Sequence, residues 1–468
     1  MELSGKKIIV VGLGKSGVSS ATFLKKRGAN VIVTDSSKDK KLFDAAGKLQ
    51  KIGIAVELGY HDSSSFRDSE IIVLSPGVPH TIEPVVNAAK NGASIIGEIE
   101  LASRFIKEPI VAITGTNGKT TTTILTGKML EESGLKVFVG GNIGNPLIDY
   151  VDSGNKADIV VAEISSFQLD TIEYFSPKVS VLLNITEDHL DRYPDFNAYA
   201  KSKMRIFINQ KDGDYAVFNA SDKHISLMAK DIKCRILPFF NHNTLNDYNE
   251  FAKIADDRIV FNINNIAAIN SDATNPDKTF EKEFSLPFSG IHLLGKHNME
   301  NVAAATLATL AAGGNIAGIK SALEKFKSLP HRIEHVATIN GVEYYNDSKA
   351  TTVDSVIKAL EVFNKPVILI MGGRNKGSNF ALLADAAKKH VKRLILIGES
   401  KEEIKSSLGG IVETTLSDSL ENAVVTASKF AETDEVVLLS PACSSFDMFT
   451  SYAHRGETFR NAVKSLYL

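Results

Sequence analysis

The chain reads IVAITGTNGKTT over residues 110–121, and this stretch decides the fold of its middle part. The apolar first half predicts a strand buried on both faces, and the helical pattern after it completes a strand–loop–helix unit. Gly115 and Gly118 allow the loop to turn its backbone N–H groups inward around a phosphate. Lys119 adds a point charge for the β- and γ-phosphates, and the Thr120 hydroxyl can bind Mg²⁺. The stretch therefore predicts a nucleoside-triphosphate site.

Beyond this stretch, short runs rich in Val and Ile alternate with helical patterns along most of the chain. Near-continuous apolar runs of this kind are typical of parallel strands that helices cover on both faces. The predicted strands are Ile8–Val11, Val31–Thr34, Ile71–Leu74, Ile110–Thr114, Ile159–Glu163, Val179–Leu183, Val367–Met371, Leu394–Ile397 and Val436–Ser440. The predicted fold class is therefore α/β, with several doubly wound sheets in series.

A second glycine-rich turn, IIVVGLGKSG, occupies residues 8–17 and leads into a predicted helix, Val18–Arg27. Its glycines permit a tight turn that brings backbone N–H groups to a pyrophosphate at the helix N-terminus. Asp35 ends the next strand, where an acidic residue would face a ribose. The loop 75–79 follows strand Ile71–Leu74 at the same sheet edge and could close the pocket. Taken alone, the turn indicates an NAD-dependent oxidoreductase, or a glycine turn that only packs a helix on a strand.

The two turns together favour a different interpretation. A dehydrogenase has no use for a second loop built to hold a triphosphate and its metal. We therefore expect the first turn to hold a nucleotide-linked substrate and the second to hold ATP. Because one sheet rarely needs both turns, we predict domain boundaries near Gly97–Leu101 and Ser328–Pro330. The predicted domains are residues 1–97, 98–328 and 329–468.

The bulk composition excludes several classes of protein. The 468 residues carry a net charge of −2, which gives no electrostatic case for nucleic acid or an anionic membrane. The two cysteines, Cys234 and Cys443, lie far apart and outside any metal-ligand spacing, which favours a reduced protein without disulfides. No apolar stretch reaches the roughly 18 residues of a membrane span, and no signal-peptide pattern opens the chain. We expect a cytoplasmic location, and we interpret the polar stretch Asn241–Leu286 as a surface excursion of the middle domain.

The middle domain offers further candidates for catalysis. The predicted strand Ile159–Glu163 ends in a carboxylate, and this position beside a phosphate loop suits a Mg²⁺ ligand. His189 follows the next strand on the same rim, although a surface loop rich in helix-capping acids would give the same pattern. Lys203 lies in a predicted helix, 199–206, and its spacing alone indicates only a solvated surface lysine.

Seven blocks of the chain resemble, in order and over nearly its whole length, the motifs of the Mur ligases. They are TGTNGKT at 114–120, EISSFQ at 163–168, DHLDRY at 188–193, GKHNMEN at 295–301, LPHR at 329–332, NDSKAT at 346–351 and LSPACSSFD at 439–447. Within the family, the blocks at 188–193, 346–351 and 439–447 resemble the member that adds D-glutamate. The resemblance implies three domains: a Rossmann-like N-terminal domain, a P-loop-type central ATPase domain and a Rossmann-like C-terminal domain.

The resemblance also implies roles for individual residues. Those implied to bind ATP are Gly115, Thr116, Asn117, Gly118, Lys119, Thr120, Thr121, Asn298, Asn301, Arg332 and Asp347. The implied metal ligands are Thr120, Glu163, His189 and Lys203, and the implied catalytic residues are Lys119, Glu163, His189 and Lys203. The implied contacts to the UDP-linked substrate are Gly14, Ser16, Asp35, Ser36, Ser75, Asn142 and His189. Those implied to receive D-glutamate are Lys349, Thr351, Lys376, Ser445, Phe446 and Tyr452.

The chemistry implied by the resemblance is an ATP-dependent ligation in peptidoglycan biosynthesis. ATP would phosphorylate the carboxylate of UDP-N-acetylmuramoyl-L-alanine, and the amine of D-glutamate would attack the acyl phosphate, leaving ADP and phosphate. The resemblance also implies two Mg²⁺ ions, a carbamylated Lys203 and a monomer. Ligases that add another amino acid, or glutamate to folate, are the alternatives, and the first glycine turn argues against folate.

Four positions depart from the family pattern. Lys15 and Ser37 are unexpected on the uridine side, and Tyr452 stands where phenylalanine is usual. Arg374 stands where an acidic residue is expected, close to Lys376.

Overall fold

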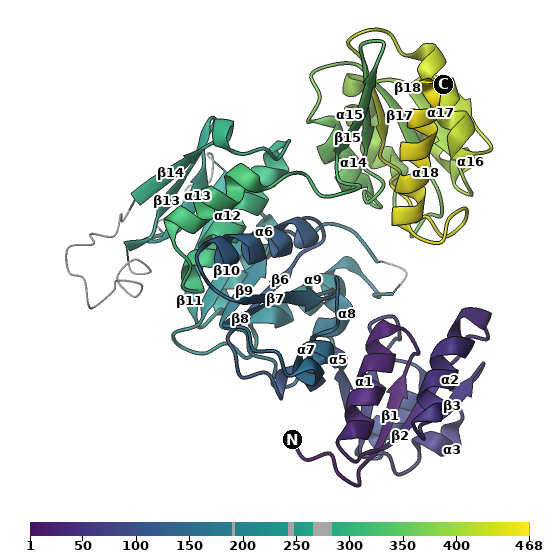
Figure 1. Ribbon diagram of the computed structural model, residues 1–468. Helices are drawn as coiled ribbons and strands as arrows, with labels where there is room; N and C mark the ends of the chain where they lie inside the picture. The colour runs from purple at the N-terminus through teal and green to yellow at the C-terminus, as the bar shows by residue number, and fades with distance from the viewer. Residues whose placement is uncertain (190–191, 242–247, 265–282, 468) are drawn as a thin grey trace. The chain divides into compact units, whose positions relative to one another are not determined.

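The computed structural model describes residues 1–189, 192–241, 248–264 and 283–467, and these form three α/β sheets flanked by helices (Figure 1). The described chain divides into two compact units. Unit 1 comprises Met1–Ile185, Asn197–Pro287 and Asn301–Leu323, and unit 2 comprises Thr186–Phe196, Phe288–Glu300 and Glu324–Leu468. The predicted α/β class is confirmed, and we retain 1–97, 98–328 and 329–468 as the proposed domains.

The first sheet is entirely parallel, with the strand order β3-β2-β1-β4-β5. Its strands are β1 (Lys7–Val11), β2 (Asn30–Asp35), β3 (Ala55–Leu58), β4 (Ile71–Leu74) and β5 (Ser94–Gly97). Its helices are α1 (Lys15–Lys26), α2 (Phe43–Lys51), α3 (Ser63–Phe66) and α4 (Glu83–Lys90). Strands β2 and β3 lie on one side of β1, and β4 and β5 lie on the other. A topological switch point therefore lies at the carboxyl end of β1. The glycine turn of residues 12–17 occupies that point.

The central sheet has the order β14-β13-β12-β11-β10-β9-β6-β8-β7. Its strands are β6 (Ile110–Thr114), β7 (Val137–Gly141), β8 (Ile159–Glu163), β9 (Val179–Leu182), β10 (Tyr215–Asn219), β11 (Arg235–Asn241), β12 (Phe251–Ile254), β13 (Arg258–Asn262) and β14 (Glu283–Pro287). Helices of this part are α5 (Glu98–Ser103), α6 (Lys119–Glu132), α7 (Leu147–Ser153), α8 (Ser166–Leu169), α9 (Phe196–Met204), α10 (Lys223–Met228), α12 (Lys296–Ala311) and α13 (Ile316–Lys325). β6 lies between β8 and β9, so the loops after these three strands meet at one edge.

The stretch Asn241–Leu286 was predicted to be a surface excursion, and its described parts correct that interpretation. β12 pairs in parallel with β11, and β13 and β14 continue the central sheet as antiparallel strands. Phe261 of β13 stacks on Phe284 of β14 with ring centroids 4.6 Å apart. The parts of this stretch at 242–247 and 265–282 lie outside the described residues.

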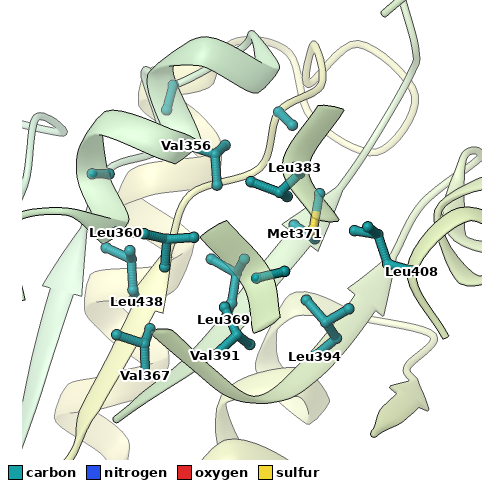
Figure 2. Close-up of a cluster of buried hydrophobic side chains, with 14 of the residues drawn as sticks. Val356, Leu360, Val367, Leu369, Met371, Leu383, Val391, Leu394, Leu408 and Leu438 are labelled. Carbon is teal, nitrogen blue, oxygen red and sulfur yellow. The ribbon is translucent and has the colours of Figure 1, made fainter. Parts of the chain in front are cut away.

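The third sheet has the order β15-β16-β20-β17-β18-β19, and β15 is antiparallel to β16. Its strands are β15 (Glu334–Ile339), β16 (Val342–Asn346), β17 (Val367–Gly372), β18 (Val391–Ile397), β19 (Thr414–Leu416) and β20 (Val436–Leu439). Its helices are α14 (Val353–Leu360), α15 (Ala384–His390), α16 (Lys401–Leu408), α17 (Leu420–Phe430) and α18 (Tyr452–Lys464). Figure 2 shows Val356 and Leu360 of α14 beside Leu369 of β17 and Leu438 of β20 in the core on one face of this sheet.

Candidate active site

The phosphate loop connects β6 to α6, as the sequence predicts. Gly118 caps α6 with a φ of +83°, a left-handed conformation that favours glycine. A Cβ at Gly118 would lie 2.2 Å from Oδ1 of Asn301. That amide belongs to α12 and also accepts a hydrogen bond of 3.3 Å from the Thr122 hydroxyl. Asn301 is thus packed against the turn of the loop, consistent with its predicted place in the ATP site.

Two lysine ammonium groups converge on one backbone carbonyl of this loop. Nζ of Lys119 donates to the carbonyl oxygen of Gly115 at 2.8 Å and to that of Thr116 at 2.9 Å. Nζ of Lys203, which is buried, donates to the same Gly115 oxygen at 2.8 Å. The hydroxyl of Tyr199, which lies in α9 with Lys203, forms a hydrogen bond of 3.1 Å with the Thr116 hydroxyl. Lys203 is therefore part of the phosphate loop's support, whereas spacing alone indicated a solvated surface position.

Asn184 fastens the phosphate loop, a role that the sequence analysis missed. It lies two residues beyond the end of β9. Its Oδ1 accepts the Asn117 N–H at 2.8 Å, and its Nδ2 donates to the Asn117 carbonyl at 3.1 Å. Its own carbonyl accepts the Thr116 N–H at 3.0 Å. The sequence signal was available, because a polar residue just past the strand next to a phosphate loop faces that loop.

Glu163, at the end of β8, presents a buried carboxylate oxygen that no hydrogen bond from the described residues satisfies. The residue is 2% exposed, and its Oε1 accepts a hydrogen bond of 2.7 Å from Nδ2 of Asn142. Its Oε2 has no hydrogen-bond partner among the described residues. An unsatisfied buried carboxylate oxygen is costly unless something else binds it. A divalent cation is the ligand that such an oxygen fits.

The glycine turn of the first sheet is held by two side chains that were predicted to contact substrate. Oδ2 of Asp35 accepts the backbone N–H of Leu13 at 2.8 Å, and its Oδ1 accepts that of Ser37 at 2.8 Å. Ser75 is buried and its hydroxyl donates to the Gly12 carbonyl at 3.1 Å. A Cβ at Gly17 would lie 1.9 Å from that carbonyl oxygen, so only glycine fits there. Asp35 and Ser75 thus shape the turn in addition to any contact with a ligand.

In unit 2, the residues predicted to receive D-glutamate follow the carboxyl ends of neighbouring strands. Lys349 and Thr351 come after β16, Lys376 after β17, and Ser445 after β20. Because β16, β20 and β17 are adjacent and parallel, their loops share one edge of the sheet. Tyr452 begins α18, and its ring centroid lies 3.7 Å from Nζ of Lys349. This cation–π contact uses the ring face, which tyrosine and phenylalanine share.

Asp347, predicted to contact the ribose, is buried beside β20. Its Oδ2 accepts a hydrogen bond of 2.9 Å from the Ser440 hydroxyl, and its Oδ1 accepts the Ile333 N–H at 3.2 Å. Burial raises the pKa of Asp347 to about 7, although these hydrogen bonds oppose the shift. The side chain is thus held in a fixed orientation near the loop that carries Arg332.

Arg455 of α18 joins the loops around this edge, and the sequence analysis did not identify it. Its guanidinium is 0% exposed, and its Nη2 donates to the Ser348 carbonyl at 2.8 Å and to the Cys443 carbonyl at 3.1 Å. Its Nε donates to the Ser348 hydroxyl at 3.0 Å. Desolvation lowers its pKa to about 10, so it stays charged near neutral pH. Arg455 therefore fixes the segments that carry Lys349 and Ser445.

The unexpected Arg374 is compensated by a neighbouring carboxylate. Its guanidinium forms two hydrogen bonds with Glu399, of 2.9 and 2.8 Å. The backbones of Arg374 and Ser444 also exchange two hydrogen bonds of 3.0 Å. The positive charge that this departure adds near Lys376 is thus balanced locally.

His189 lies in the loop after β9, and Asn298 lies in the first turn of α12; both belong to unit 2. His189 has a φ of +57°, a strained conformation for a residue other than glycine, and its N–H binds Oδ1 of Asp188 at 2.9 Å. Nδ2 of Asn298 donates to the Leu294 carbonyl at 2.6 Å. Leu190 and Asp191 of the DHLDRY block lie outside the described residues.

Several residues predicted to contact ATP or a substrate are exposed or half-buried at the loops described above. They are Gly14, Ser16, Ser36, Asn117, Thr120, Asn142, Arg332, Thr351, Lys376 and Phe446. Phe446 is the most open of the aromatic residues here, at 65% exposed, whereas the neighbouring Ser445 is 2% exposed. Thr116, Thr121 and Asn301 are instead buried and support the phosphate loop from within.

No cluster of three or more His, Cys, Asp or Glu side chains suited to a metal ion occurs among the described residues. The predicted ligand set contains only Glu163 and His189 of these types, and they belong to different units. The two cysteines are both unpaired and buried, as expected of a protein without disulfides.

Comparison with known proteins identifies the family. Residues 6–97 match the Mur ligase MurD-like N-terminal domain, residues 113–309 the Mur ligase middle domain, and residues 331–443 the Mur ligase glutamate ligase domain. The chain belongs to the Mur ligase family, and it is therefore an ATP-dependent ligase that forms amide bonds.

Curated relatives match over the full length of the chain. The UDP-N-acetylmuramoylalanine–D-glutamate ligase of Desulfosudis oleivorans is 46% identical, covering 100% of this chain and 98% of that protein. The enzyme of the same name from Geotalea daltonii is 47% identical, covering 100% and 99%. These matches exclude the oxidoreductase interpretation of the first glycine turn.

Solved structures with the same fold include other members of the family. The MurF ligase of Thermotoga maritima in complex with ADP superposes with a TM-score of 0.61 at 17% identity, covering 99% of each chain. The UDP-N-acetylmuramate–alanine ligase MurC of the same organism gives 0.58 at 19% identity, covering 98% of this chain and 99% of that one. No helix in the described part of the chain is long and apolar enough to span a membrane.

Proposed function

We propose that this enzyme joins D-glutamate to UDP-N-acetylmuramoyl-L-alanine with consumption of ATP, in peptidoglycan biosynthesis. Full-length identity of 46–47% to ligases of that name supports the substrates. The observation that carries the chemistry is the phosphate loop at Lys119, together with the unsatisfied Oε2 of Glu163 at the end of the neighbouring strand. These are the two kinds of group that phosphoryl transfer requires, a fixed cation and a metal-binding carboxylate.

The reaction proceeds in two balanced steps. A carboxylate oxygen of the L-alanine residue attacks the γ-phosphorus of ATP, and the bond to the β-phosphate oxygen breaks, releasing ADP. The D-glutamate amine, after losing a proton, then attacks the acyl carbon, and inorganic phosphate leaves. Lys119 neutralises the transferred phosphate, and the loop around Gly115 and Gly118 aligns it for attack.

Mg²⁺ bound at this site would neutralise charge on the phosphates. We assign Thr120, Glu163, His189 and Lys203 as the residues that hold it, in two sites. The amide of Asn142 orients Glu163 through its 2.7 Å hydrogen bond, leaving Oε2 for the cation. Such hydrogen bonds to a ligand typically contribute about 10–100-fold to metal affinity.

We propose that Lys203 is carbamylated, and its surroundings support this modification. An ammonium group here shares the Gly115 carbonyl with Lys119, which places two like charges close together, one on a buried and one on a half-buried side chain. Reaction of the neutral amine with carbon dioxide replaces one of these cations with an anionic carbamate, which can bind metal. Intact-protein mass spectrometry should show the added carbon dioxide, and Lys203→Ala should regain activity with a short carboxylate. A wild-type protein without the added mass, together with no rescue, contradicts the carbamate.

The residues assigned to the UDP-linked substrate, to D-glutamate and to the adenosine of ATP come from different parts of the chain. We assign the turn at Gly14 and Ser16, with Ser36 and Asn142, to the UDP-linked substrate. Lys349 and Lys376, with hydroxyls of Thr351 and Ser445, receive the two carboxylates of D-glutamate. Asn298, Asn301, Arg332 and Asp347 are assigned to the adenosine of ATP. We further propose a monomer in the cytoplasm, where ATP and the UDP-linked substrate are available.

Substrate specificity is tested by supplying ATP and UDP-N-acetylmuramoyl-L-alanine with one amino acid at a time. Phosphate release should require D-glutamate and should fail with L-glutamate, L-alanine or a diamino acid. Phosphate release only with another amino acid would mean that the protein is a ligase but that D-glutamate is not its substrate. Release with none would refute the proposed reaction.

A further inference from the structure

Lys15 is the residue of the first glycine turn that departs from the family pattern, and its side chain has a defined position. Its Nζ donates to the Gly144 carbonyl at 2.7 Å and to Oδ1 of Asn145 at 2.9 Å. Both acceptors lie in the loop between β7 and α7, more than a hundred residues away in the chain. Lys15 therefore connects the turn of the first sheet to a loop of the central sheet.

That loop is the one that carries Asn142. Its conformation is closed by a hydrogen bond of 2.9 Å from the Gly141 N–H to the Asn145 carbonyl. The Asn142 N–H donates to the Glu163 carbonyl at 2.8 Å, and its side chain orients the Glu163 carboxylate. The two acceptors of Lys15 thus belong to the same short loop as Asn142. That residue is assigned to bind the UDP-linked substrate, and its side chain also orients Glu163.

The charge of Lys15 is not neutralised by this arrangement. Both of its acceptors are neutral oxygens, and none of the ion pairs among the described residues involves it. An ammonium group has three N–H donors, of which two are used here. Lys26, at the other end of α1, differs because it forms an ion pair of 2.5 Å with Asp152. The ammonium group of Lys15 at the start of α1 is therefore a fixed cation with one N–H still available. It lies beside the turn that is assigned to the diphosphate of the substrate.

We propose that Lys15 binds the diphosphate of the UDP-linked substrate with its third N–H while it holds the Asn142 loop against the glycine turn. The inference rests on the proposed function, since it assumes that the turn receives a UDP group. The ammonium supplies a charge that the backbone N–H groups of the turn lack, and charge-assisted hydrogen bonds are about twice as strong as neutral ones. Its hold on Gly144 and Asn145 fixes where that charge lies.

The test compares two ligands that differ only in the diphosphate, UDP and uridine, by titration calorimetry or ligand-detected NMR. Lys15→Met keeps most of the side chain's length and removes the charge. It should weaken UDP binding about tenfold and leave uridine binding within about twofold, because uridine has no phosphate. Lys26→Met is the matched control on the same helix, and it should leave both affinities unchanged. Thermal melting of each variant checks the fold.

A double-mutant cycle tests the second part of the proposal. Asn145→Ala removes one of the two acceptors that hold the ammonium, and it should weaken UDP binding about threefold. In the Lys15→Met background the same change should have no further effect, because the group it positions is gone. Additive losses would overturn the positioning role.

The outcomes separate this inference from the function on which it rests. If the wild-type protein binds UDP and Lys15→Met binds it equally well, the inference is wrong and the proposed function stands. If Lys15→Met weakens the binding of UDP and of uridine equally, Lys15 acts on the shape of the turn. That result would also overturn the inference. A wild-type protein that binds no UDP refutes the nucleotide site and the inference together.

Discussion

The replacement Glu163→Gln should greatly raise the Mg²⁺ concentration that ligation requires and yet stabilise the protein when metal is removed. Glutamine has nearly the same volume, and its carbonyl oxygen can still accept the hydrogen bond from Asn142 that Oε1 accepts at 2.7 Å. The change therefore removes one negative charge and replaces the unsatisfied Oε2 with the NH2 group of an amide. It separates the chemical role of the carboxylate from its packing.

The magnitudes follow from the surroundings of Glu163. An unsatisfied buried group costs more when it is charged than when it is neutral, so removing the charge should gain about 1–3 kcal/mol although the glutamine NH2 still lacks an acceptor among the described residues. For a folding unit of this size, such a gain corresponds to a rise in melting temperature of about 2–10 °C. The concentration of Mg²⁺ at half-maximal activity should rise more than about 100-fold, since even a residue that only orients a ligand contributes 10–100-fold.

Thermal melting in a chelator and phosphate release over a Mg²⁺ series measure the two effects on the same protein. Glu163→Asp is the matched control, since it keeps the charge and shortens the reach. A Glu163→Gln protein that melts several degrees lower would mean that the carboxylate stabilises the fold. An unchanged Mg²⁺ requirement would contradict its role as a ligand.

Three further changes have effects that the structure sets. Arg455→Met leaves the Ser348 and Cys443 carbonyls without their donor and should cost about 3–5 kcal/mol in urea unfolding followed by tyrosine fluorescence, whereas Arg460→Met on the same helix should cost under about 1 kcal/mol. Asn184→Ala releases the phosphate loop and should raise the KM for ATP about tenfold while kcat changes less; a normal KM would contradict the loop's dependence on this amide. Glu98 is buried, its pKa is raised to about 7, and its charged form is therefore disfavoured in the folded state. The stability that it contributes when protonated is lost as pH rises from about 4.5 to 7, so Glu98→Gln should gain up to about 3 kcal/mol over wild type at pH 8 and nothing at pH 4, and a pH-independent difference would refute this.

The parallel strands could be predicted because they are buried on both faces. The apolar runs at Ile71–Leu74, Ile110–Thr114 and Ile159–Glu163 coincide with β4, β6 and β8 to the residue. The antiparallel and edge strands could not be found in this way. β15, for example, has mostly half-buried or exposed residues, and a strand that is not covered on both faces carries no continuous apolar run.

The candidate site was predictable where function requires a residue at the end of a strand. Glu163 and the phosphate loop follow from that rule, because carboxyl ends of parallel strands meet at one edge. The roles of Arg455 and Lys15 depend on contacts between segments more than a hundred residues apart. Neither contact leaves a local pattern in the sequence, so only the folded chain reveals it.

The central claim is that ATP activates the carboxylate of the UDP-linked substrate, and an oxygen-transfer experiment tests it most directly. UDP-N-acetylmuramoyl-L-alanine labelled with ¹⁸O in its terminal carboxylate is incubated with ATP, Mg²⁺ and D-glutamate, and the released phosphate is analysed by mass spectrometry. Acyl-phosphate chemistry predicts that each phosphate released carries one labelled oxygen from the substrate. Unlabelled phosphate would mean that water attacks ATP directly, and that would contradict the proposed ligation.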